Sequence, residues 1–162
     1  MRFFCGDDIK PMKYILRVRN LFLFASALLS IVRFGYRRTV PKNPPRKVLI
    51  IQTAQLGDMV CITPVFRALT QLLPGLTVYV AGNALNRELL KDNNDVDEYI
   101  VFDEKMFFQF VGQLSKENID VACMRGFGFG SLVAALFAGI PTIIAPKTTS
   151  GRTLQTRMYR ML

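Results

Sequence analysis

Between residue 47 and about residue 146, apolar and polar positions follow a pattern typical of alternating strands and helices. Short apolar runs, as in buried parallel strands, alternate with longer segments in which apolar residues recur at helical spacing. The predicted strands are Val48–Ile51, Thr77–Ala81, Tyr99–Phe102, Asp120–Cys123 and Thr142–Ala145. The predicted helices are Asp58–Leu73, Leu85–Lys91, Lys105–Lys116 and Ser131–Ala138. We therefore expect an α/β fold, a Rossmann-like parallel sheet with helices on both faces.

The first 46 residues follow a different pattern, so we divide the chain into regions 1–46 and 47–162. Leu21–Val32 is apolar apart from two serines, but it is shorter than the roughly 20 residues that a bilayer span requires. A helical conformation would gather its polar neighbours on one narrow stripe, formed by Arg19, Ser26, Ser30, Arg33 and Arg37. The pattern suits an amphipathic helix in a membrane interface, and a helix packed on protein is the alternative. The proline-rich Val40–Arg46 predicts a linker.

The charge distribution supports this division. Residues 1–47 hold eleven Lys and Arg against two Asp, whereas residues 48–162 hold ten basic and ten acidic residues. The formal net charge of +9 therefore lies in the N-terminal segment. A nucleic-acid-binding protein would carry such charge on its folded domain, so we expect no nucleic acid partner. An anionic membrane surface fits better, and the expected location is the inner face of the cytoplasmic membrane.

The cysteines and the lack of histidine argue against several kinds of site. Cys5, Cys61 and Cys123 are odd in number and widely spaced, which indicates neither a disulfide framework nor a zinc site. The chain contains no histidine, so it holds no His-based triad or His metal site. The acids within Asp92–Glu98 are interrupted by asparagines and predict a solvated loop rather than a metal site.

The passage from Lys47 to Leu73 is the most informative part of the chain. A predicted strand leads through a polar turn to Leu56-Gly57-Asp58, where a helix is expected to begin. Ligands of open α/β sheets bind at the carboxyl ends of the strands, and a carboxylate there can accept a proton from a sugar hydroxyl. The alternative is that Asp58 only caps the helix. Thr63-Pro64 predicts either a kink or a second helix start with Thr63 as its cap.

This order of motifs resembles the N-terminal domain of glycosyltransferase family 9, the heptosyltransferase family. The matching features are the strand KVLII, the LGD triplet, Thr63-Pro64 and the triplet Arg67-Ala68-Leu69. Asn94–Ile100 and Ile119–Val121 are similar to the family's NPxVDEVI and YDLVIDL passages, with Asp95 where proline is usual. The resemblance covers Lys47 to about Gly139 and does not extend to residues 1–46.

The resemblance implies one half of a GT-B fold, in which two Rossmann-like domains face a cleft. Members of the family transfer a sugar, typically heptose from ADP-heptose, to a lipopolysaccharide core acceptor with inversion, and need no cofactor or metal. The LGD aspartate, here Asp58, would act as general base on the acceptor hydroxyl. Gly57 and Thr63 belong to the same motif and are counted as substrate-binding candidates. The chain is too short to include the donor domain of the family as well. On its own it is therefore expected to be inactive.

Three further positions are candidates for the acceptor site. Arg125 ends a predicted strand and suits contact with an anionic sugar, although a solvated surface arginine is the alternative. Asn86 and Arg87 follow the second strand, where a capped, solvated helix start is the competing interpretation. The glycines of Gly126–Gly130 precede a helix and can bring N–H groups close to an anion, but a tight turn explains them more simply.

Two other functions compete with glycosyl transfer. A non-catalytic Rossmann-like module that holds a nucleotide or a partner at the membrane surface fits a chain without a donor domain. A nucleotide-dependent oxidoreductase is less favoured, because the first strand is not followed by GxGxxG. The helical pattern of the tail stops at Leu162 without a cap, which suggests a truncated domain.

Overall fold

The computed structural model describes residues 25, 44–53, 55–125 and 128–145, and these form a parallel sheet covered by helices. The strands are β1 (Lys47–Ile51), β2 (Thr77–Gly82), β3 (Glu98–Val101), β4 (Val121–Met124) and β5 (Thr142–Ile144). They lie side by side in the order β3-β2-β1-β4-β5, and every neighbouring pair is parallel. The predicted Rossmann-like sheet is therefore confirmed.

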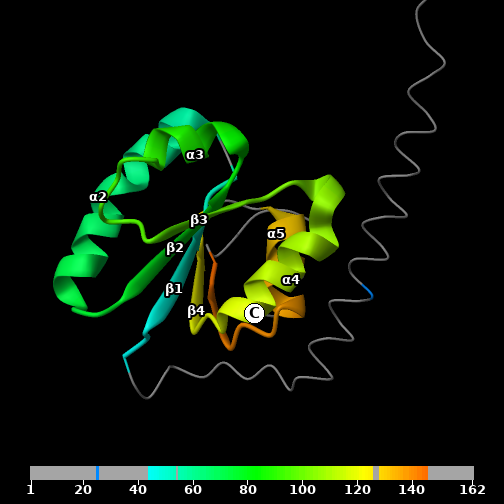
Figure 1. Cartoon of the computed structure of the whole chain (residues 1–162). Helices are drawn as coiled ribbons and strands as arrows, with labels where there is room; N and C mark the ends of the chain where they lie inside the picture. Colours follow the sequence, from blue (N-terminus) through cyan, green and yellow to red (C-terminus); the bar gives the residue numbers. More distant parts are fainter. Residues whose placement is uncertain (1–24, 26–43, 54, 126–127, 146–162) are drawn as a thin grey trace, which may run out of the picture.

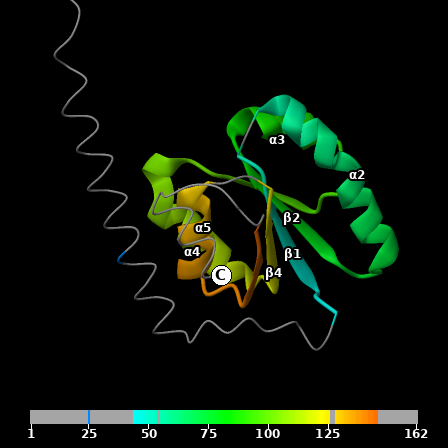
Figure 2. The same ribbon diagram turned by 180° about the vertical axis from the view of Figure 1, so that it is seen from behind.

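Helices cover both faces of the sheet, as predicted (Figure 1). On one face lie α2 (Leu56–Leu72) and α3 (Ala84–Leu90). On the other face lie α4 (Phe107–Glu117) and α5 (Phe129–Phe137). Figure 2 shows the same separation from behind. Right-handed crossovers produce this arrangement when a chain winds outward from a central strand in both directions.

The period of two along β1 explains why the sheet has two cores. Val48 and Ile50 belong to the core under α2 and α3, whereas Leu49 and Ile51 belong to the core under α4 and α5. All four side chains are buried, as expected for a central parallel strand. Phe66, in the middle of α2, is fully buried, and burial of such a ring stabilises the fold by about 1.5–3 kcal/mol.

Several helix boundaries in the structure differ from the predicted ones. Helix α2 begins at Leu56 and α5 at Phe129, each two residues before the predicted start. The predicted helix Lys105–Lys116 is divided into a 3-10 turn, η1 (Glu104–Met106), and α4. The turn has its own cap, because the Asp103 carboxylate accepts a hydrogen bond of 2.9 Å from the Lys105 N–H. This local bond competes with a continuous helix.

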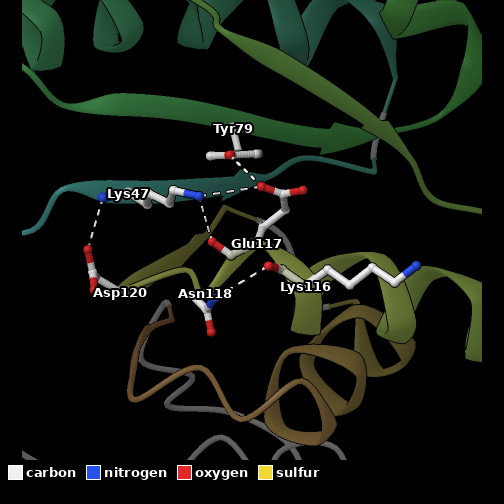
Figure 3. Close-up of polar contacts among 6 residues, drawn as sticks. All are labelled: Lys47, Tyr79, Lys116, Glu117, Asn118 and Asp120. Carbon is white, nitrogen blue, oxygen red and sulfur yellow. Dashed lines mark hydrogen bonds and ion pairs between the residues drawn. The ribbon is translucent and has the colours of Figure 1, made fainter.

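The amino-terminal edge of the sheet carries a polar network (Figure 3), in which the Lys47 and Glu117 side chains are 35% and 33% exposed. Asp120 Oδ2 accepts hydrogen bonds from the Arg46 and Lys47 N–H groups at 2.8 and 2.9 Å. Lys47 Nζ donates to the Glu117 carbonyl at 2.8 Å and lies 3.4 Å from its carboxylate. The hydroxyl of the buried Tyr79 donates to the same carboxylate at 2.7 Å. These contacts join the start of β1 to the end of α4 and the start of β4.

Predictions for the terminal regions fall outside the described residues. This applies to the amphipathic helix and most of the linker within 1–46, to Gly126 and to the tail from 147 onward. Among the residues that the structure does describe, no helix combines the length and the apolar character that a bilayer crossing requires.

Candidate functional site

The strand order places a switch point at the carboxyl end of β1. From β1 the chain moves through α2 to β2 on one side, and β4 lies on the other side. The loops that leave β1 and β4 therefore diverge, and open α/β sheets bind ligands in the crevice between such loops. The first loop leads to Asp58, and the second begins with Arg125.

Asp58 and Arg125 contact each other at the carboxyl edge of the sheet. The Arg125 Nη1 atom donates a hydrogen bond of 2.8 Å to the main-chain carbonyl of Asp58 and lies 3.6 Å from its Oδ1 atom. The two side chains are 45% and 44% exposed, so the pair is open to solvent. The Arg125 N–H also donates to the carbonyl of Ile51 at 3.2 Å, which ties the start of this loop to β1. The two residues, which the sequence placed at the same edge of the sheet, are therefore in direct contact.

Asp58 does not cap α2, so this alternative is wrong. The N-cap is Gln55, and its side chain makes no capping hydrogen bond. Asp58 is the third residue of the helix and lies in the first turn, where the helix dipole attracts a negative charge. Its carboxylate is therefore not used to satisfy the helix terminus and stays available to a ligand.

Gly57 and Thr63, the other two candidates of the same motif, also lie on α2. Gly57 is the second residue of α2, and a Cβ placed on it would meet no atom within 4 Å outside its chain neighbours and its own helical backbone. The Thr63 hydroxyl donates to the carbonyl of Val60 at 2.8 Å. That carbonyl is the one from which Pro64 removes the helical N–H donor. The Thr63 hydroxyl therefore replaces the donor that this carbonyl lacks.

Helix α2 runs without interruption from Leu56 to Leu72, through Pro64. The predicted second helix start, with Thr63 as its cap, is therefore wrong. The back-bond from the Thr63 hydroxyl supplies the donor that the proline lacks, and it allows the helix to continue.

Asn86 and Arg87 are not brought to Asp58. Asn86 is fully buried, and its N–H donates the capping bond to the Asn83 side chain at 2.8 Å. The cap of the predicted alternative, a capped and solvated helix start, is confirmed, but Asn86 is buried rather than solvated. Arg87 is exposed and lines two hollows of about 490 and 410 Å³ along the outer edge of β3. Burial raises the pKa of Tyr99 in these hollows, while the charge of Arg87 opposes that shift.

A larger hollow, about 630 Å³, opens at the carboxyl ends of β1 to β4. We call it the carboxyl-edge hollow. Its polar lining comes from the residues that follow each strand and from the start of α5, including Thr53, Asn83, Asp103, Lys105 and Ser131. Phe102 adds an aromatic ring to the wall. Hydroxyl, amide, carboxylate and ammonium groups around an aromatic ring suit a ligand rich in hydroxyl groups, such as a sugar.

Thr53, Asp103 and Lys105 line the carboxyl-edge hollow but were not predicted from the sequence. Each follows a predicted strand within a few residues, and this position at the carboxyl end of a strand could have indicated them.

The glycine at position 128 has a structural explanation, because a Cβ on Gly128 would approach Ser131 Oγ to 2.6 Å. The Ser131 hydroxyl donates to the Gly128 carbonyl at 2.9 Å. Gly128 is the N-cap of α5 with an extended backbone, and Phe129, the first residue of the helix, is buried.

Gln52 is a further buried polar residue at the end of β1. It is 1% exposed, and its N–H donates to the Ala81 carbonyl at 2.8 Å. Its Oε1 atom has no hydrogen-bond partner among the described residues. A buried amide of this kind costs stability, and it lies directly before the loop that leads to Asp58.

Comparisons with known proteins give matches among solved structures. No known family model matches the chain, and no curated protein does. Among solved structures, E. coli ADP-heptose lipopolysaccharide heptosyltransferase II matches at 28% identity with a TM-score of 0.55, over 61% of this chain and 30% of that chain. The predicted resemblance to glycosyltransferase family 9 is confirmed.

Two further structures share the fold. The glycosyltransferase family 9 protein of Veillonella parvula matches at 14% identity with a TM-score of 0.53. E. coli heptosyltransferase WaaC, solved with ADP, matches at 16% identity with a TM-score of 0.54. Each match covers 70% of this chain and 39% of the other. The chain therefore matches between 30% and 39% of the length of these proteins.

Proposed function

We propose that this chain is the acceptor-side half of an inverting, heptosyltransferase-like glycosyltransferase. The donor would be a nucleotide sugar such as ADP-heptose, and the acceptor a lipopolysaccharide-type or other glycolipid. The observation that carries the proposal is the half-exposed Asp58 carboxylate at the switch point, held beside Arg125. The 28% identity to heptosyltransferase II supports the choice of sugar transfer over other chemistry at this position.

In the proposed reaction, Asp58 acts as the general base. Its carboxylate accepts the proton of an acceptor hydroxyl, and the acceptor oxygen attacks the anomeric carbon of the donor sugar. The bond from that carbon to the nucleoside diphosphate breaks, and the diphosphate leaves with the electron pair. One displacement of this kind inverts the anomeric centre. The donor would be held by a second domain that faces the carboxyl edge of this sheet.

Arg125 has two proposed roles in this site. Its bond to the Asp58 carbonyl fixes the first turn of α2 and thereby orients the base. Its exposed guanidinium is also placed to receive an anionic group of the acceptor. The carboxyl-edge hollow would take sugar rings of the acceptor, because its polar groups and Phe102 match a polyhydroxylated ligand. We further propose that the protein acts at the inner face of the cytoplasmic membrane, where a glycolipid acceptor is presented.

The test is glycosyl transfer by the product of the complete reading frame, with ADP-heptose and a truncated lipopolysaccharide acceptor. Loss of a general base lowers the rate by about 10²- to 10⁴-fold, so Asp58→Asn should reduce kcat by that factor. Asp92→Asn is the matched control, because Asp92 is an exposed carboxylate in the loop after α3 and should leave kcat unchanged.

Two outcomes would contradict the proposal. Transfer that survives Asp58→Asn would remove the proposed base. Absence of transfer from every nucleotide sugar tested, together with nucleotide binding that Asp58→Asn leaves intact, would favour the non-catalytic binding module.

A further inference from the structure

One half of the sheet lacks a described helix on one of its faces. Helices α2 and α3 connect β1, β2 and β3, and they are the only described helices on their face (Figures 1 and 2). Ile143 packs against the core under α4 and α5, so the period of two turns its neighbours Thr142 and Ile144 toward the α2 face. Ile144 is 57% exposed there, and Cys123 on β4 is half-buried. Sheets of parallel strands are normally covered on both faces, so this half of the α2 face needs a further cover.

The flank of α2 that faces β4 extends this apolar surface. Asp58 lies on that flank, because it contacts Arg125 after β4. Thr70 lies on the other flank, where its hydroxyl is 3.3 Å from a carboxylate of the loop before β3. The positions seven and fourteen residues after Asp58 share its side of the helix, and they hold Val65 and Leu72, which are 48% and 77% exposed. We call the whole surface the β5-side shelf, and it consists of Val65, Leu72, Cys123, Thr142 and Ile144.

Two helical patterns of the chain lie outside the described residues, Leu21–Val32 and the tail. The tail continues from β5, at the end of the strand order. Right-handed crossovers put α4 and α5 on one face as the chain moved from β3 to β4 and then to β5. A helix that continues outward from β5 therefore belongs to the face of α4 and α5. This leaves Leu21–Val32 as the candidate cover of the β5-side shelf.

The sequence of Leu21–Val32 suits a buried helix. Apart from two serines, every residue of the segment is apolar, and a helix that is apolar nearly all round is normally buried. Phe24, Leu28 and Ile31 recur at helical spacing, on a side that avoids both serines. Ala25, the one described residue of the segment, is helical and exposed, and it lies off this row.

The chain can also reach the shelf. As a helix, the twelve residues of Leu21–Val32 measure about 18 Å, close to the length of a five-residue strand. The eleven residues 33–43 span up to about 36 Å when extended. Two strand spacings of about 4.8 Å separate β1, which the linker enters, from β5. The linker is therefore long enough to place the segment on any strand of this half.

We propose that Leu21–Val32 forms a helix that packs on the β5-side shelf of its own chain and completes the α2 face of the sheet. Phe24, Leu28 and Ile31 face the shelf, and the stripe of arginines and serines lies on the opposite side of the helix, in solvent. This placement favours a helix packed on protein over a helix in a membrane interface. It does not depend on catalysis.

Tryptophan fluorescence of the full chain, without vesicles, tests the contact. The chain contains no tryptophan, so Phe24→Trp reports on the segment alone. Its emission should be blue-shifted, as for a buried indole. Adding Ile144→Lys should shift the emission to the red, because a charge on the shelf disfavours apolar packing. Phe108→Lys is the matched control, because Phe108 is 74% exposed on α4 at the opposite face, and it should leave the emission unchanged.

Three outcomes of this experiment would overturn the proposal. Red emission of Phe24→Trp would show a solvated segment, and a blue shift on addition of phosphatidylglycerol vesicles would then place it in a membrane interface. Blue emission that Ile144→Lys leaves unchanged would place the segment elsewhere on the protein. Blue emission that is lost on dilution would show that the segment packs on a second copy of the chain.

The reactivity of Cys123 gives an independent measurement. In a chain with Cys5→Ser and Cys61→Ser, Cys123 is the only thiol. Leu28→Asp should accelerate its alkylation, because loss of the cover exposes the half-buried thiol. Ala25→Asp introduces the same charge at an exposed position off the packing row and should leave the rate unchanged. Equal rates in both variants would show that the segment does not cover the shelf, and the proposal would fail.

Discussion

The two edges of the sheet use charged residues in opposite ways. At the amino-terminal edge, Asp120 accepts two main-chain hydrogen bonds at 2.8 and 2.9 Å, and Tyr79 and Lys47 both approach Glu117. At the carboxyl edge, the side chains of Asp58 and Arg125 lie 3.6 Å apart and are about half exposed.

This difference separates residues that stabilise the fold from residues that can bind a ligand. A carboxylate that accepts several hydrogen bonds from other elements fixes those elements and has little capacity left for a ligand, whereas Arg125, which bonds the Asp58 carbonyl through Nη1, has further guanidinium N–H donors. An exposed pair at 3.6 Å contributes little to stability and can exchange one partner for a ligand at small cost. We therefore expect substitutions at the amino edge to change stability, and substitutions at the carboxyl edge to change activity.

The largest change in stability is expected for Asp120→Ala. The substitution leaves the Arg46 and Lys47 N–H groups without their acceptor, and charged hydrogen bonds of this kind are worth about 2 kcal/mol. Urea unfolding should show that loss. Asp92→Ala, which removes an exposed carboxylate, should stay within about 0.5 kcal/mol of wild type. An equal effect of the two substitutions would show that the amino-edge network does not stabilise the fold.

A smaller loss is expected for Thr63→Val. Valine keeps the branched shape but removes the hydroxyl that bonds the Val60 carbonyl beside Pro64, which should cost about 1 kcal/mol. Thr63→Ser keeps the hydroxyl and should restore most of that stability in thermal or urea unfolding. If Thr63→Val instead lowered transfer without lowering stability, Thr63 would be a substrate-binding residue after all.

The sequence predicted the fold well because the main signals are local. The short apolar runs of the strands and the helical spacing of apolar residues between them placed each element to within a few residues. Parallel strands share one carboxyl edge, so Asp58 and Arg125 could be placed there from the sequence alone.

Rotation of helices and competition between local hydrogen bonds could not be predicted in this way. The sequence makes Asn86 a candidate ligand residue, but the packing of α3 turns it inward, where it is fully buried. The Asp103 carboxylate caps the 3-10 turn η1, which takes the place of the first turn of the helix predicted over Lys105–Lys116. The pairing of Lys47 with Glu117 depends on residues 70 positions apart, and no sequence pattern indicates it.

A still smaller effect on stability is expected for Asp58→Asn. The substitution removes a charge from the first turn of α2 and weakens an exposed pair, which should cost less than about 1 kcal/mol. Urea unfolding of this variant beside Asp120→Ala compares the two edges directly. A loss at Asp58 as large as the loss at Asp120 would contradict the comparison, because Asp58 would then be needed for folding.

The smallest effect concerns the pH dependence of stability at Glu117. The hydrogen bond from the Tyr79 hydroxyl, followed by the contact with Lys47, lowers the pKa of the Glu117 carboxyl. A carboxyl group with a lowered pKa in the folded state stabilises the fold fully above its unfolded pKa of about 4.3. That stabilisation is lost as the pH falls through the lower pKa of the folded state. The urea midpoint of wild type should therefore decrease more steeply than that of Glu117→Gln between about pH 5 and pH 3. Parallel curves would show that the contact with Tyr79 does not persist in solution, and that the two edges differ less than their geometry indicates.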